Sequence, residues 1–229
     1  MVGESAGKDA AAMKMLILCN GEYGDPSWYR SRMSGYFRVI CTDGAACMAR
    51  RIGIVPDLVV GDMDSIAAED RVSLESAGAR FQVYPPEKDL TDTQIAYEIA
   101  REQGASFVTV WGGTGSRLDH TLSTLHNAFM LVEHGIDVCL ASPDVTIHLV
   151  RRRLALTGSP GDTVSLIVLG DRATGVTLTG FRYPLRNATL EGTWQIGVSN
   201  CMTLADPVVE VADGNVAVFH YHRLPDEAL

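Results

Sequence analysis

The chain has 229 residues with 28 acidic and 19 basic side chains, which gives a formal net charge of −9 at pH 7. A chain of this length can bury a full-sized hydrophobic core in one large domain or two modest ones. The acidic balance argues against a nucleic-acid or membrane-surface partner, because both require a concentrated positive face.

Neither the N-terminus nor the cysteines indicate export from the cytoplasm. Residues 1–13 are mostly small and polar, and we expect them to form a disordered lead-in. The apolar run at 15–19 is too short for a signal peptide or a membrane span. The 5 cysteines are scattered without a Cys-x-x-Cys pair, which favours reduced thiols in a cytoplasmic protein.

Residues 14–142 alternate short apolar runs, polar turns and longer amphipathic segments, a pattern typical of βα units on a parallel sheet. We predict an α/β domain over this range, built on an open, mostly parallel, Rossmann-like sheet. Its expected strands cover residues 15–19, 37–42, 58–61, 80–84, 107–111 and 137–141.

Polar, chemically capable residues follow five of these strands directly. The turns are Asn20-Gly21-Glu22, Asp43-Gly44, Asp62 to Ser65, Lys88 to Asp92, and Gly112 to Asp119. In open α/β sheets the ligand crevice lies at the carboxyl ends of the strands. We therefore expect the five turns to converge on one edge of the sheet.

The central motif is Gly61-Asp62-Met63-Asp64-Ser65, at the exit of a buried strand. If the extended geometry persists through Asp64, the i and i+2 carboxylates share one face and need a cation or a shared proton. Mg²⁺ suits such a pair beside substrate phosphates. The alternative is that both aspartates are turn residues and Ser65 is the N-cap of the next helix.

Thr91 and Gln94 have the spacing of a capping box, so we expect a helix to begin there. Asp92 then lies in the first helical turn, where the helix dipole favours a carboxylate, and it also lies at the edge of the crevice.

The glycine-rich turn at 112–116 opens the next helix, so its N–H groups could cradle phosphate while Arg117 supplies a fork of donors. Neither a Walker A loop nor a Gly-x-Gly-x-x-Gly fingerprint occurs, which disfavours a standard P-loop or dinucleotide site. We expect His120 to be an ordinary helix residue.

After Pro143 the sequence changes to short alternating runs separated by glycines, which predicts an all-β sandwich over 143–229. The expected strands cover residues 146–150, 163–169, 175–178, 194–198, 208–211 and 216–221. His220 and His222 alternate on the last strand, and we expect an exposed strand face rather than a metal site.

A set of short motifs runs through both halves of the chain in a fixed order. They are Asp43-Gly44-Ala45-Ala46, Pro56-Asp57, Gly61 to Ile66, Lys88 to Asp92, Gly115 to His120, Gly180 to Leu185 and Gly197-Val198-Ser199-Asn200. In this order and spacing they resemble the thiamine pyrophosphokinase family, whose members move a pyrophosphoryl group from ATP to thiamine. Ser116, where a glycine is expected, and Gln94, where some members carry lysine, depart from the pattern.

The resemblance implies a catalytic, nucleotide-binding domain at 14–142 and a thiamine-binding domain at 143–229. It also implies a homodimer with its active site near the subunit interface, Mg²⁺ as cofactor, and ATP and thiamine as substrates. The implied metal ligands are Asp62, Asp64 and Asp92, and Arg117 completes the implied catalytic set. The implied nucleotide-binding residues are Asp43, Gly44, Asp89, Thr91, Gly113 and Ser116. The implied thiamine-binding residues are Asp119, Tyr183, Ser199 and Asn200, although Asp119 could instead face phosphate.

Two alternatives stay open at this point. A pyrophosphokinase for another heterocyclic alcohol, such as a hydroxymethylpterin, would share the catalytic half, but the Ser199-Asn200 turn argues against it. A non-catalytic thiamine-binding module would predict a damaged acidic set, whereas Asp62, Asp64 and Asp92 are all present.

Overall fold

The computed structural model describes residues 13–87, 89–115 and 117–222. The expected disordered lead-in therefore lies almost entirely outside the described residues. Within the described part of the chain, no helix is long and apolar enough to cross a membrane.

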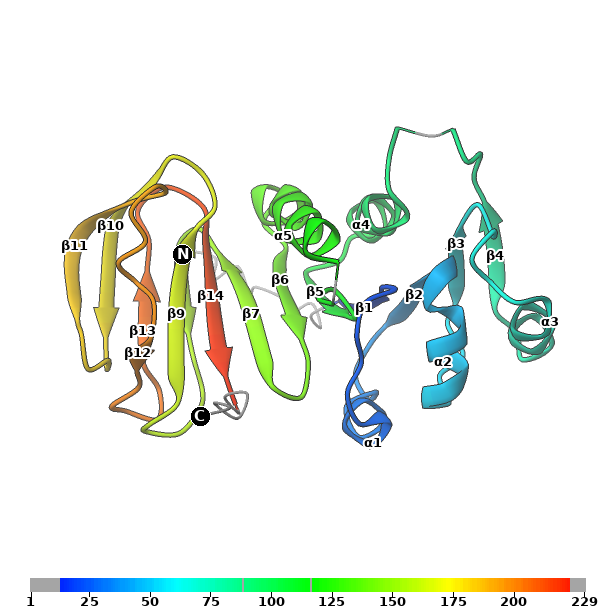
Figure 1. Ribbon diagram of the computed structural model, residues 1–229, viewed down its shortest axis with the longest axis horizontal. Coiled ribbons are helices and arrows are strands. Elements are labelled where there is room, and N and C mark those ends of the chain that lie inside the picture. The colour runs from blue at the N-terminus through cyan, green and yellow to red at the C-terminus, as the bar shows by residue number, and fades with distance from the viewer. Residues whose placement is uncertain (1–12, 88, 116, 223–229) are drawn as a thin grey trace, which may run out of the picture.

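The first half of the chain forms six parallel strands in the order β4-β3-β2-β1-β5-β6 (Figure 1). The strands are β1 (Lys14–Leu18), β2 (Arg38–Thr42), β3 (Leu58–Gly61), β4 (Arg80–Val83), β5 (Phe107–Trp111) and β6 (Asp137–Ala141). All six strands predicted from the sequence are confirmed, because their pattern of short apolar runs between polar turns is strong.

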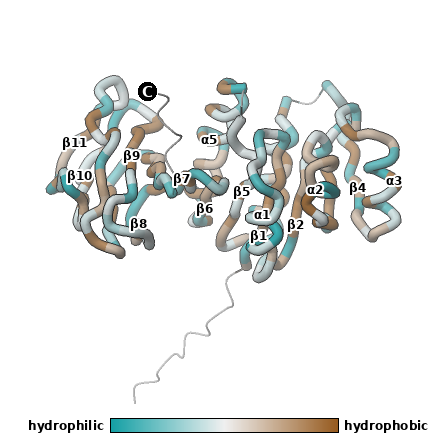
Figure 2. Tube along the Cα trace, turned by 60° about the horizontal axis from the view of Figure 1, so that its bottom comes forward, coloured by the Kyte–Doolittle hydropathy of each residue, from teal (hydrophilic) through white to brown (hydrophobic). Residues whose placement is uncertain are grey.

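Helices cover both faces of this parallel region. They are α1 (Pro26–Arg30), α2 (Ala46–Ile52), α3 (Ala68–Ser76), α4 (Asp92–Glu102) and α5 (Leu118–Glu133). Ile95 of α4 and Phe129 of α5 belong to one core cluster, whereas Tyr29, Ala49 and Leu74 of the other three helices belong to a second. Strand β2, between these layers, is largely hydrophobic (brown in Figure 2).

The second half is entirely β-structure apart from its turns. The large sheet continues antiparallel from β6 through β7 (Val145–Val150), β14 (Val216–Tyr221), β9 (Thr163–Val168) and β12 (Asn200–Cys201). A second antiparallel sheet contains β11 (Leu185–Glu191), β10 (Arg172–Thr179), β13 (Val208–Glu210) and β8 (Arg153–Ala155). The β half is thus confirmed, but a single 10-stranded sheet joins it to the α/β half.

The predicted strand at residues 194–198 is wrong, because this segment forms turns. The Gln195 side chain accounts for the difference: Oε1 accepts the Val168 N–H at 3.1 Å and Nε2 donates to the Val168 carbonyl at 3.2 Å. A side chain therefore makes the hydrogen bonds that a neighbouring strand would make. The prediction also omitted β8, β11 and β12.

The expectation that His220 is exposed is also wrong, because Gly158 covers its ring so closely that an added Cβ would lie 2.8 Å from His220 Cε1. His220 is 2% exposed, and its Nε2 lies 2.9 Å from Asp162 Oδ2. The rings of His220 and His222 lie 4.5 Å apart, centroid to centroid. Burial, followed by the proximity of these two imidazoles, lowers the pKa of His148 to about 4.

We expect the protein to lose stability as the pH falls through 6.5, with His148 accounting for about 2 kcal/mol of the loss at pH 5. The unfolded chain protonates this imidazole near its ordinary pKa, whereas the folded chain resists protonation until a lower pH. Acid therefore favours the unfolded state. Urea unfolding at pH 7 and pH 5 measures the effect in the parent and in His148→Gln, with the exposed His126→Gln as the control. Equal pH dependence in parent and His148→Gln would contradict the assignment, whatever His220, His222 and Asp162 contribute.

Candidate active site

A cavity of about 540 Å³ lies where the carboxyl ends of the parallel strands meet the N-termini of α4 and α5. Each of the five predicted turns contributes to its lining. The lining residues from these turns include Asn20, Gly21, Glu22, Asp43, Gly44, Ser65, Leu90, Thr91, Asp92, Gly112, Gly113, Thr114, Gly115 and Arg117. The predicted convergence on one edge of the sheet is confirmed.

Three carboxylates gather at this edge. Asp43, Asp62 and Asp64 each offer an oxygen within 4.8 Å of the others. The expectation that extended geometry brings Asp62 and Asp64 together is wrong, because β3 ends at Gly61 and Met63 has a φ of 68°. A turn joins them instead, in which Asp62 Oδ1 accepts the Asp64 N–H at 3.1 Å.

Asp43 completes the cluster from the neighbouring strand. Its carboxylate accepts the N–H of Gly44 at 2.6 Å and that of Met63 at 2.9 Å. A Cβ on Gly61 would lie 2.6 Å from Asp43 Cγ, so the close approach of the two loops requires glycine.

The acidic cluster carries concentrated negative charge. Asp43 is 4% exposed, and burial, followed by the nearby Asp92 carboxylate, raises the pKa of Asp43 to about 6. The charge of Asp92 therefore acts on Asp43, although Asp92 is not one of the three residues whose oxygens lie within 4.8 Å of one another. Clustered carboxylate oxygens of this kind fit a hard divalent cation such as Mg²⁺.

The glycine-rich loop after β5 is held by the loop after β1. The Cys19 N–H donates to the Trp111 carbonyl at 2.8 Å, and the Glu22 N–H donates to the Thr114 carbonyl at 2.7 Å. The Tyr23 hydroxyl donates to the carbonyls of Cys19 and Trp111 at 2.9 and 3.1 Å. This bonding continues the β1–β5 pairing into the cavity wall. The predicted site residue Ser116 lies outside the described residues.

Arg117 lines the cavity and pairs with Asp119, their Nη2 and Oδ2 atoms lying 2.6 Å apart. The hydrogen bond to Arg117 lowers the pKa of Asp119. Both side chains are about two-thirds exposed, at 68% and 66%, so this pair is open to rearrangement when an anion binds.

Sequence reasoning missed cavity residues on α5. His120, Thr121 and Thr124 line the cavity together with Arg117, whereas the sequence predicts only an ordinary helix residue at His120. Their spacing places them on one helical face with Arg117, and this spacing was the available signal.

The N-terminus of α4 has the predicted capping box. Thr91 Oγ1 accepts the Gln94 N–H at 3.2 Å, and Gln94 Oε1 accepts the Thr91 N–H at 2.9 Å. Thr91 and Asp92 both line the cavity, whereas Asp89 is absent from its described lining.

We expect Thr91→Val to lower the stability of the protein by about 0.5–2 kcal/mol, since it removes the cap. Turnover should fall as well, because the start of the helix determines where Asp92 lies. Thermal melting and AMP release measure the two effects, and Thr91→Ser, which keeps the hydroxyl, is the matched control. A parent-like melting curve for Thr91→Val would show that the cap contributes nothing.

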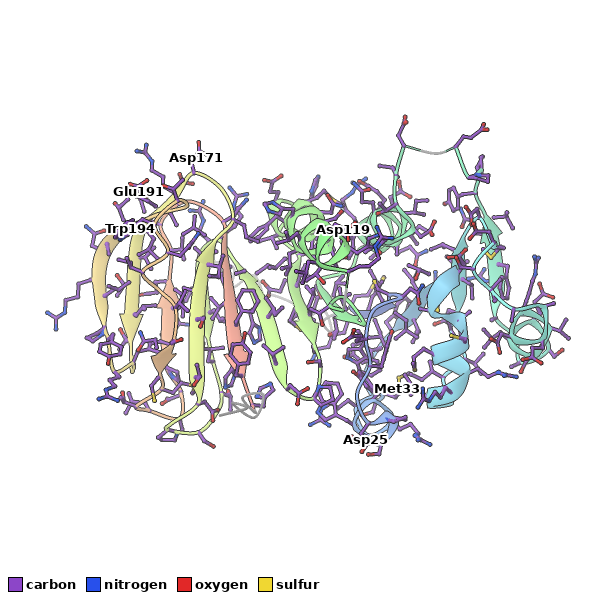
Figure 3. The ribbon with its side chains drawn as sticks, viewed as in Figure 1. Asp25, Met33, Asp119, Asp171, Glu191 and Trp194 are labelled. Carbon is purple, nitrogen blue, oxygen red and sulfur yellow. The ribbon has the colours of Figure 1, made fainter. Side chains whose placement is uncertain are left out.

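The candidate residues of the β half lie away from this cavity. Among the described residues, Tyr183, Ser199 and Asn200 do not line it. Figure 3 shows the turn at Trp194 at the far end of the β half, well separated from Asp119 on α5.

A cluster of carboxylates beside a glycine-rich loop, at the carboxyl edge of parallel strands, defines an α/β enzyme that handles phosphates. The family model described as "Thiamin pyrophosphokinase, catalytic domain" matches residues 30–140, and "Thiamin pyrophosphokinase, vitamin B1 binding domain" matches residues 145–215. The chain belongs to the thiamine pyrophosphokinase family.

Relatives from distant organisms agree with this assignment. The thiamine pyrophosphokinase of Bacillus subtilis is 30% identical over 158 residues, which cover 65% of this chain and 70% of the relative. Thiamine pyrophosphokinase 1 of Oryza sativa is 24% identical over 221 residues, which cover 84% and 81%. The crystal structure of the Bacillus subtilis protein has the same fold, with a TM-score of 0.81 at 23% identity, over 92% of this chain and 100% of that one.

Proposed function

We propose that this chain transfers the pyrophosphoryl group of ATP to the hydroxyl of thiamine in the cavity at the carboxyl edge of its parallel strands. Thiamine diphosphate and AMP are the products. The observation that carries the proposal is the cluster of Asp43, Asp62 and Asp64, of which Asp43 lines the cavity together with the glycine-rich loop. We assign catalysis to a Rossmann-like domain at 14–142 and thiamine binding to residues 143–229.

Asp62, Asp64 and Asp92 would hold Mg²⁺, with Asp43 as a fourth carboxylate from the neighbouring strand. The ion would neutralise negative charge on the phosphates as the pyrophosphoryl group moves. The chain's own contribution is to gather these oxygens before the substrate arrives. The raised pKa of Asp43 is consistent with this role: burial is its main cause, and the negative charge of Asp92 adds to it.

The nucleotide would lie across the glycine-rich loop and the N-terminus of α4. The backbone N–H of Gly113 suits a phosphate oxygen, and Arg117 offers a bidentate fork. Gly44, whose N–H is held by Asp43, would lie against the nucleotide without a side chain in the way. Asp89, Thr91 and Ser116 complete the proposed nucleotide set.

Thiamine would be held by residues from two chains of a homodimer. Tyr183 and Ser199 would contact the acceptor from one subunit, while Asp119 faces it from the α5 helix of the other. Among the described residues, Tyr183 and Ser199 do not line the cavity of their own chain, which supports this arrangement. An aromatic face and a carboxylate suit the fixed positive charge of the thiazolium ring.

We place the enzyme in the cytoplasm. All five cysteines are free, and three of them, Cys19, Cys41 and Cys139, are buried. Reduced, buried thiols suit a reducing compartment.

An assay of AMP release tests the proposed reaction. With Mg²⁺ and ATP, we expect AMP to form only when thiamine is added, in equal amount with thiamine diphosphate detected by mass spectrometry. A hydroxymethylpterin serves as the competing acceptor, and its preferential use would overturn the choice of substrate. Thiamine binding without AMP release would indicate a binding module.

A further inference from the structure

Tyr183 lies on a short exposed segment between β10 and β11. Its side chain is 60% exposed, and Arg182 Cζ lies 5.7 Å from the centroid of its ring. Phe181 forms an isolated bridge with Met202, and the Arg182 N–H donates to the Cys201 carbonyl at 2.8 Å. Tyr183 itself is not part of a strand, so its N–H and carbonyl need hydrogen-bond partners other than a neighbouring strand.

The side chain of Asn200 supplies those partners. Its Oδ1 accepts the N–H of Tyr183 at 3.0 Å and that of Cys201 at 2.8 Å, and its Nδ2 donates to the Tyr183 carbonyl at 2.8 Å. The reversed amide would place N–H against N–H, so these contacts determine its orientation. An asparagine amide has about four hydrogen-bonding positions, and the backbone occupies three of them.

Ser199 has the opposite environment. Asn200 is 5% exposed, whereas Ser199 is exposed and has a φ of 59°. The Ser199 N–H donates to Ser165 Oγ at 2.9 Å, which holds this turn in place. Of the two neighbours, Ser199 presents its side chain to solvent and Asn200 presents its side chain to the backbone of the Tyr183 segment.

We infer that Asn200 is a positioning residue: it fixes the main chain at Tyr183, and therefore the ring, instead of contacting the acceptor itself. This inference rests on the proposed role of Tyr183 in holding thiamine. A ring that is already in place binds a cationic heterocycle better than a mobile one, because less ordering is required on binding. The sequence-based expectation that Asn200 binds thiamine directly is thereby replaced.

Asn200→Asp tests the inference, because aspartate keeps the oxygen that accepts from Tyr183 and Cys201 but replaces the amide donor with a second oxygen, which faces the Tyr183 carbonyl. We expect the KM for thiamine to rise by about tenfold, with kcat and the KM for ATP within about twofold of the parent. In a Tyr183→Ala background, Asn200→Asp should add less than about twofold to the KM for thiamine, because the ring that it positions is gone.

Ser199→Ala is the matched control. Ser199 is proposed to contact thiamine directly, so its effect on the KM should multiply with that of Tyr183→Ala. If the effect of Asn200→Asp also multiplies, the positioning role is overturned in favour of direct contact. Should Asn200→Asp fail to fold, the neutral Asn200→Ser is measured in the same cycle.

Amide hydrogen exchange, measured without any substrate, tests whether Asn200 fixes the main chain at Tyr183. Exchange at the Tyr183 N–H should be about tenfold faster in Asn200→Ala, which removes the oxygen that accepts this N–H, than in the parent, and an unchanged rate would overturn the inference. If Tyr183→Ala leaves the KM for thiamine unchanged while AMP release persists, the acceptor role of Tyr183 and this inference both fail, but the proposed reaction stands. Loss of the proposed reaction would show separately, as no AMP release by the parent.

Discussion

Asp64→Asn should abolish Mg²⁺-dependent turnover while leaving the fold intact, with kcat falling by at least about 100-fold. Asp64 is exposed, and asparagine keeps its size and the oxygen that accepts from Ser65 Oγ at 2.8 Å. The hydrogen bond from the Asp64 N–H to Asp62 Oδ1 is also kept. What disappears is one negative charge from a cluster whose oxygens lie within 4.8 Å of one another.

AMP release across a range of Mg²⁺ concentrations measures this effect, and thermal melting checks the fold. Asp171→Asn is the matched control, because Asp171 is an exposed aspartate in the β half that does not line the cavity (Figure 3). It removes the same charge from the chain and should leave turnover unchanged. Near-parent turnover by folded Asp64→Asn would remove Asp64 from the proposed metal site.

The location of the site could be predicted from the sequence because the patterns that indicate it lie within short stretches of the chain. Each polar turn follows an apolar run, and parallel strands bring their carboxyl ends to one edge whatever the details of packing. The capping box at Thr91 and Gln94 is equally local, since its two hydrogen bonds span three residues.

The composition of the acidic cluster could not be predicted in the same way. The sequence pointed to Asp62 and Asp64 as a pair, and by resemblance to Asp43 as a nucleotide contact. Asp43 joins the pair through its hydrogen bond to Met63, 20 residues along the chain, and through the absence of a side chain at Gly61. The spacing of apolar residues in the sequence does not reveal either contact.

The β half shows the same limit. Gln195 bonds to Val168 across 27 residues, and Asn200 bonds to Tyr183 across 17, so both side chains stand in for strand partners. Alternation of apolar residues reports which face of a strand is buried. It does not report which side chain completes the backbone hydrogen bonding of an irregular segment.

We expect Gly21→Ala to weaken ATP binding at the cavity wall that the glycine-rich loop forms. A Cβ on Gly21 would lie 2.2 Å from the Thr114 carbonyl oxygen and 2.3 Å from that of Gly112, so the two loops must move apart. The 2.7 Å bond from the Glu22 N–H to Thr114 would then break. Because a shift of the loop misplaces its N–H groups, we expect the KM for ATP to rise by about tenfold or more.

Titrations of ATP at saturating thiamine and of thiamine at saturating ATP measure this change, and the KM for thiamine should stay within about twofold of the parent. Gly104→Ala is the control for simple destabilisation: its φ of +78° disfavours alanine, but its Cβ would meet nothing within 4 Å. It should cost about 1 kcal/mol of stability and leave the KM for ATP unchanged. If Gly21→Ala binds ATP as the parent does, the glycine-rich loop is not the phosphate-binding wall of the cavity, and the nucleotide must lie closer to α4.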